Sequence, residues 1–145
     1  MLLRFPIFRL GLLVVALFFT LACNPRERVD LARRTADDFH SRYNREDYRG
    51  MYGHAGSAVR SSSTEAEFIK YEKDVRSKLG DLQSAEVVNY NLVYHFSGPE
   101  VRLDYKCSFA NGMGVESFEI AFEKGKAVIN GYRLDSPQLE AKPGR

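Results

Sequence analysis

After residue 28, the apolar side chains of this chain first follow a helical period and later a strand period. Residues 28–44 carry apolar side chains spaced three and four apart, which predicts a helix with one apolar face. A short helix is expected around residues 46–52. A third helix is predicted to begin at Thr64, where Glu67 completes a capping-box signature, and to end at Gly80. The expected stripes are Val29, Ala32, Ala36, Phe39 and Tyr43 in the first helix, and Phe68, Tyr71, Val75 and Leu79 in the third.

From residue 88 the period changes to two, and short turns separate four alternating segments, which predicts four strands. The residues expected on the inner face are Val88, Tyr90, Leu92, Tyr94 and Phe96; Val101, Leu103, Tyr105, Cys107 and Phe109; Phe118, Ile120 and Phe122; and Val128, Asn130, Tyr132 and Leu134. Such strands form an antiparallel meander with one apolar face, which the helices can cover. The predicted fold class is therefore α+β, with three N-terminal helices packed on a four-stranded antiparallel meander in one domain, residues 29–135.

The segment before the helices is predicted to direct export. Residues 1–22 contain two arginines, no acidic residue, and an uncharged run at 10–22 that ends on a small residue before Cys23. This is the layout of a signal peptide, and the run is shorter than the roughly 20 residues that span a bilayer. The Thr-Leu-Ala-Cys sequence ending at Cys23 resembles the lipobox of bacterial lipoproteins. That resemblance implies cleavage before Cys23 and lipidation of its thiol by acyl chains such as palmitate.

A lipid on Cys23 would anchor the protein to a membrane of the bacterial cell envelope. Residues 23–28 are then the lipidated cysteine and a tether, and residues 136–145 a polar C-terminal tail. By resemblance to lipoprotein sorting rules, Asn24 in place of Asp favours the periplasmic side of the outer membrane over the inner membrane. Plain secretion and an uncleaved membrane anchor remain as alternatives.

Charge and cysteine content narrow the classes of function. Loss of residues 1–22 removes two of the 21 basic residues and no acidic one, which leaves 19 against 19 acidic residues. A formally neutral mature chain argues against nucleic-acid binding. If Cys23 carries lipid, Cys107 has no disulfide partner, and its position in an apolar row predicts a buried thiol; a reactive or metal-binding thiol is the alternative.

The order of elements resembles the cystatin-like cone of the nuclear-transport-factor-2-like superfamily, and more closely its small exported bacterial members of unknown function. The residues that carry this resemblance are the segment 39–52, the helix end Lys78-Leu79-Gly80, and the closing Val128-Ile129-Asn130-Gly131-Tyr132. The resemblance implies a curved sheet. It leaves the function open, because the superfamily includes isomerases, polyketide cyclases and dehydratases as well as binding and assembly modules.

An enzyme of this shape needs a general base on the inner face of the sheet. The predicted inner rows contain no carboxylate or histidine, and His40 is expected at the surface. We therefore expect no catalysis, no cofactor and no metal. The polar inner positions form a candidate pocket of Tyr90, Tyr94, Tyr105, Asn130 and Tyr132.

The expected role is the binding of a small apolar ligand or an envelope protein, in the cone or on the outer sheet face. One alternative is an isomerase- or dehydratase-like enzyme that uses the cone pocket. The other is a homo-oligomeric assembly module, for example a homodimer through the outer sheet face. The apolar positions predicted on that face are Val87, Val93, Ala121 and Ile129.

Overall fold

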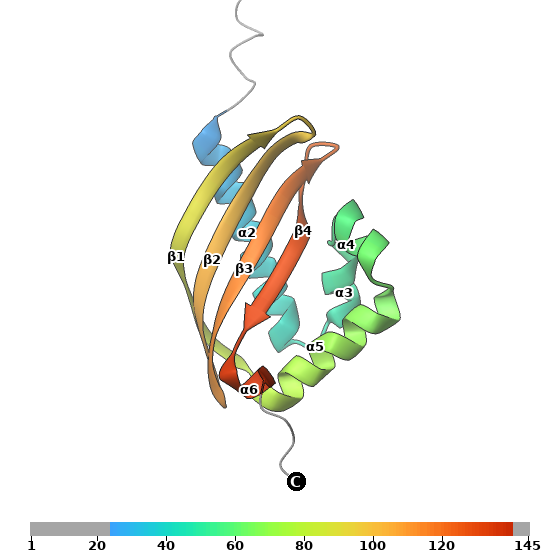
Figure 1. The fold of residues 1–145 in the computed structure, drawn as a ribbon, viewed down its shortest axis with the longest axis vertical. Coiled ribbons are helices and arrows are strands. Elements are labelled where there is room, and N and C mark those ends of the chain that lie inside the picture. Colours follow the sequence, from blue (N-terminus) through green and yellow to red (C-terminus); the bar gives the residue numbers. More distant parts are fainter. Residues whose placement is uncertain (1–23, 141–145) are drawn as a thin grey trace, which may run out of the picture.

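The computed structural model describes residues 24–140 and has the predicted α+β architecture (Figure 1). The elements are α2 (Pro25–Asn44), α3 (Tyr48–Gly53), α4 (Ser57–Ser62), α5 (Glu65–Leu79), β1 (Leu82–His95), β2 (Gly98–Phe109), β3 (Gly112–Glu123), β4 (Lys126–Asp135) and α6 (Pro137–Glu140). The strands form one antiparallel sheet in the order β1-β2-β3-β4, which confirms the meander. The short helices α4 and α6 were not predicted.

Helix α2 begins earlier than its apolar stripe indicates. The Asn24 side chain accepts a hydrogen bond from the Arg26 N–H at 3.1 Å, and Pro25 occupies the start of the helix, where its missing N–H is not needed. Residues 25–28, expected as a tether, therefore form the first turn of α2. The predicted stripe is buried from Ala32 to Tyr43, and α2 contacts all four strands across one face of the sheet (Figure 1).

Helix α5 confirms the predicted capping box but is rotated relative to the predicted stripe. The side chain of Thr64 accepts from the backbone of Glu67, and the Glu67 carboxylate accepts from the backbone of Thr64. Tyr71, expected in the core, is 43% exposed, whereas Glu72 is 0% exposed. The buried positions 68, 72, 75 and 79 follow one straight face of the helix, and Tyr71 lies beside that face.

The predicted inner row of β2 is confirmed at every position. Val101, Leu103, Tyr105, Cys107 and Phe109 are all at most 4% exposed. These side chains form the centre of the core between the sheet and α2. Strand β2 is one of the two central strands, and it is paired with β1 on one side and β3 on the other, so the alternation of its side chains is regular.

Two register irregularities change the predicted faces of the outer strands. In β1, Val87 pairs with the inner Tyr105, and the next paired residue is Asn89. Val88, which lies between them, is 57% exposed, so its predicted place on the inner face was wrong. In β4, Ile129 pairs with the inner Ile120 and is 3% exposed, so its assignment to the outer face was also wrong. One inserted residue moves the flanking positions to the opposite face.

The edge strand β1 also extends beyond the cover that the helices provide. Phe96, predicted to face inward, is fully exposed at the β1–β2 turn. This turn lies at the same end of the domain as the N-terminus of α2 (Figure 1). Alternation predicts the face of a residue, but burial on that face needs a second layer above it.

Candidate functional site

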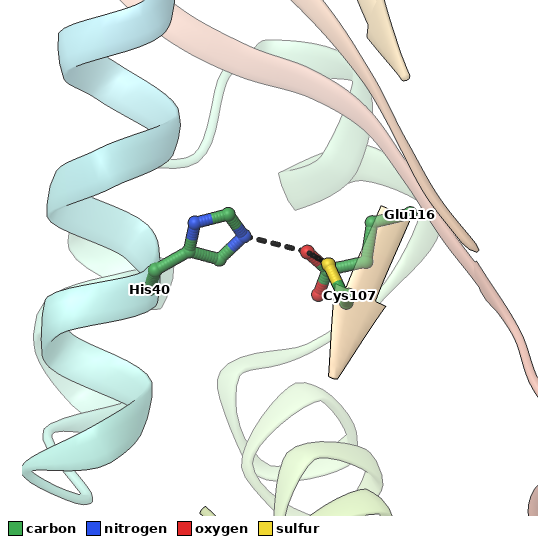
Figure 2. A group of neighbouring side chains, drawn as sticks. All are labelled: His40, Cys107 and Glu116. Carbon is green, nitrogen blue, oxygen red and sulfur yellow. Dashed lines mark hydrogen bonds and ion pairs between the residues drawn. The ribbon is translucent and has the colours of Figure 1, made fainter. Parts of the chain in front are cut away.

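A buried polar cluster joins α2 to the two central strands (Figure 2). The Nε2 atom of His40 lies 2.5 Å from Oε2 of Glu116, and the Cys107 Sγ lies 3.1 Å from the same oxygen. The hydroxyl of Tyr132 donates to the other oxygen, Oε1, at 2.9 Å. The Glu116 carboxylate is thus held by three side chains, and it is 3% exposed.

Regular structure explains why these residues meet. Tyr105 pairs with Glu116 across β2 and β3, and Cys107 pairs with Gly114, so Cys107 and Glu116 are diagonal neighbours on the inner face. His40 follows Phe39 in α2, which packs across this face. Three rigid elements therefore set the positions of the side chains in the cluster.

Aromatic rings surround the cluster and separate it from solvent. Phe118 is at their centre, with ring-centroid distances of 5.5 Å to His40, 5.7 Å to Tyr105 and 5.2 Å to Tyr132. Phe39 packs against Phe118 edge-on at 5.3 Å. Such an apolar enclosure strengthens every charge interaction inside it and penalises any charge without a partner.

The thiol of Cys107 is not activated as a nucleophile in this structure. Burial raises its pKa well above the usual range, and the negative charge of Glu116 raises it further. The imidazole of His40 contacts Glu116 rather than the sulfur (Figure 2). A protonated, fully buried thiol beside a carboxylate lacks the positive surroundings that reactive cysteines need. The predicted burial of Cys107 is confirmed.

Glu72 brings a second carboxyl group into the same interior from α5. Its side chain is 0% exposed, and neither carboxyl oxygen has a hydrogen-bond partner among the described residues. Burial raises the pKa of Glu72 to about 8, and the negative charge of Glu116 contributes to the shift. At neutral pH this group is therefore mainly protonated. The hydroxyl of Tyr105 is also buried without a partner in residues 24–140.

A cavity of about 290 Å³ opens between α4, α5 and β4, beside the cluster. Its lining residues are Val59, Ser62, Ser63, Phe68, Tyr71, Asn130, Gly131 and Tyr132. Tyr132 belongs both to this wall and to the cluster, because its hydroxyl donates to Glu116. The cavity is thus connected to the buried carboxylate through a single side chain.

The structure does not bring the five predicted pocket residues together. Tyr90 and Tyr94 are 55% and 60% exposed on the edge strand β1. Tyr105 is buried in the core, whereas Asn130 sits at the irregularity in β4 and accepts a hydrogen bond from the Ala58 N–H at 3.1 Å. Asn130 and Tyr132 share the cavity wall, and Tyr105 and Tyr132 share Phe118 as a neighbour.

The expectation of an inner face without a carboxylate or a histidine was wrong. Glu116 lies two positions before Phe118 and four before Ile120, so it belongs to the same inward-facing row. Extending the predicted alternation of this strand toward its start would have included it. Glu72 is four residues after the buried Phe68, which is also helical spacing. His40, expected at the surface, is 8% exposed. A periodicity that is defined only by apolar residues does not identify charged residues that lie on the same face.

No protein-family model matches this chain, and no match to a curated protein was found. The resemblance to the nuclear-transport-factor-2-like superfamily and its cone therefore remains a prediction, as does the lipobox. The signal peptide and Cys23 lie outside the described residues. No helix within residues 24–140 is long and apolar enough to cross a membrane.

Proposed function

We propose that this chain is a non-catalytic, lipid-anchored envelope protein whose domain binds a small, largely apolar ligand. The observation that carries the ligand proposal is the cavity between α4, α5 and β4, whose walls combine apolar and aromatic side chains with Ser62, Ser63 and Asn130. One of its lining residues, Tyr132, donates a hydrogen bond to the buried Glu116. A pocket of this kind, mostly apolar with a few polar groups, is typical of small-molecule sites. The unpartnered carboxyl of Glu72 adds a further polar group to the interior.

The start of α2 supports the anchor. The helix begins at Pro25, two residues after Cys23, so a lipid on that cysteine would hold this end of the domain at the membrane surface. The β1–β2 turn lies at the same end of the domain (Figure 1). It carries the fully exposed Phe96, and Tyr94, near the end of β1, is 60% exposed. Aromatic side chains favour the interface between water and lipid.

The anchor can be tested by mass spectrometry and detergent partitioning of the protein made in bacteria, beside Cys23→Ser. We expect an acylated N-terminus at Cys23 and partitioning into the detergent phase, both lost in the variant. A wild-type chain that stays in the aqueous phase and begins at another residue would refute the anchor and leave the ligand proposal standing.

The ligand cavity can be tested with the fluorescent apolar probe 8-anilinonaphthalene-1-sulfonate. Val59→Trp places a large ring in the cavity wall, whereas Val88→Trp adds the same ring at an exposed position of β1. We expect saturable binding to the wild type and to Val88→Trp, and at least tenfold weaker binding to Val59→Trp. Equal binding by both variants would place the probe elsewhere and contradict the proposal.

A second candidate is an isomerase- or dehydratase-like enzyme, because a carboxylate, a histidine and a tyrosine do meet on the inner face. Against it, Glu116 is 3% exposed and its hydrogen bonds are made within the protein. The test is conversion of a small β,γ-unsaturated ketone to its conjugated form, followed by ultraviolet absorbance. Turnover that disappears in Glu116→Gln would replace the binding role by catalysis.

The assembly alternative has less support. Two of the four apolar positions expected on the outer face, Val87 and Ile129, pair with inner residues of the neighbouring strands. Val93 and Ala121 remain, beside an ion pair in which Arg102 lies 3.4 Å from Glu119. A small apolar area among charged side chains is typical of a solvated sheet face.

A further inference from the structure

We propose that His40, Cys107 and Glu116 bind one zinc ion in the interior of the domain. Their ligand atoms, Nε2, Sγ and a carboxylate oxygen, all lie within 4.8 Å of one another, and all three residues are buried. Imidazole, thiolate and carboxylate are the three types of protein ligand that zinc prefers. The site is distinct from the 290 Å³ cavity, because none of these residues lines that cavity.

The distances between the ligand atoms can be compared with those of a tetrahedral zinc site. In a tetrahedral site, ligand atoms about 2.0–2.3 Å from zinc lie about 3.3–3.5 Å from one another. The contact from His40 to Glu116 is 2.5 Å and that from Cys107 to Glu116 is 3.1 Å. An ion at the cluster requires these two contacts to open by about 0.4–0.8 Å, and it requires His40 Nε2 and Cys107 Sγ, which lie within 4.8 Å of one another, to stand about 3.5 Å apart.

The charges of the interior favour a cation. The carboxylate of Glu116 is the acidic group at the centre of the cluster, and the Cys107 thiol adds a second negative charge once it has lost its proton. On binding, Cys107 releases its proton to solvent and its thiolate bonds to the metal. His40 coordinates through an unprotonated Nε2, with its ring proton on Nδ1. A Zn²⁺ ion, one thiolate and one carboxylate then sum to zero charge.

The neighbouring groups suit such a site. Tyr132 donates to the second oxygen of Glu116, which fixes the orientation of the carboxylate, as outer hydrogen bonds do around metal ligands. The carboxyl of Glu72 is fully buried without a hydrogen-bond partner among the described residues, and the charge of Glu116 raises its pKa. A cation bound by Glu116 would stabilise the ionised form of Glu72. Three protein ligands leave the fourth tetrahedral position for a water molecule.

The test uses full-length protein without a histidine tag, purified in detergent, stripped with a chelator and titrated with Co²⁺ and then Zn²⁺. Thiolate bound to Co²⁺ gives a charge-transfer absorption band, and Zn²⁺ should displace it at one equivalent. We expect Cys107→Ser to abolish the band, and His40→Gln and Glu116→Gln to weaken Co²⁺ binding at least tenfold. The control His95→Gln changes a solvent-accessible imidazole outside the cluster and should leave the titration unchanged.

Two further readouts keep the test decisive if a variant fails to fold. Because the thiol loses its proton on binding, the wild-type Zn²⁺ affinity should rise with pH between pH 6 and 8. Zinc should also raise the wild-type melting temperature, because it binds only the folded cluster. A folded wild type without a thiolate band would overturn the proposal. A band of equal strength in folded Cys107→Ser would show an adventitious ion only and would also overturn it.

Discussion

The unpartnered carboxyl of Glu72 makes the stability of this domain depend on pH in an unusual direction. Its pKa is raised from 4.5 to about 8 in the folded protein, chiefly by burial. Between these values the native state keeps a proton that the unfolded chain has released. Stability conferred by the protonated group is therefore full below pH 4.5 and is lost as the pH rises to about 8.

The size of the effect follows from the shift. Each pKa unit corresponds to 1.36 kcal/mol. Ionisation of Glu72 in the unfolded chain therefore reduces the free energy of unfolding by about 3 kcal/mol at pH 7 and about 4 kcal/mol at pH 8, relative to low pH. Glu72→Gln keeps the shape of the protonated side chain but cannot ionise. We expect this variant to match the wild type near pH 4.5 and to exceed its stability by these amounts at higher pH.

The assay is urea unfolding followed by circular dichroism from pH 4.5 to 8.5, with a chelator present so that no metal binds near Glu116. Glu86→Gln is the matched control, because Glu86 is exposed on β1. Its stability should follow that of the wild type at every pH. Wild-type and Glu72→Gln stabilities that stay parallel across this range would refute the reasoning, since they would show that Glu72 titrates alike in the folded and unfolded chains.

Three other predictions concern the helix cap, the thiol and the β1–β2 turn. Thr64→Ala removes the cap of α5 and should lower the free energy of unfolding by about 1 kcal/mol, whereas Ser61→Ala in α4 should change it little; equal urea midpoints would contradict this. In the lipidated protein, Cys107 should react with Ellman's reagent about 100-fold or more slowly until urea is added, because it is 0% exposed; rapid labelling of the native protein would contradict its burial. The chain contains no Trp, so Phe96→Trp is a unique reporter whose emission should shift to shorter wavelength when the lipidated protein enters vesicles. An unchanged spectrum would place this turn away from the bilayer.

Local patterns in the sequence predicted the elements and much of the core. The three- and four-residue spacing in α2, the capping box at Thr64 and the alternation in β2 each depend on interactions within one or two turns of helix or between adjacent strands. Such short-range interactions produce a helical or two-residue period of apolar positions, which can be recognised in the sequence before the fold is known. The α+β class follows from the order of these periods along the chain.

The tertiary structure alone decided which residues meet in the interior. His40 and Glu116 are 76 positions apart, and only the packing of α2 across the sheet brings them into contact. The irregularities in β1 and β4 turned Val88 outward and Ile129 inward, because each changes the phase of a period-two strand. The spacing of Glu116 and Glu72 places both on inward-facing rows, but the hydrogen bonds that hold the Glu116 carboxylate in the interior come from distant elements and have no trace in the sequence.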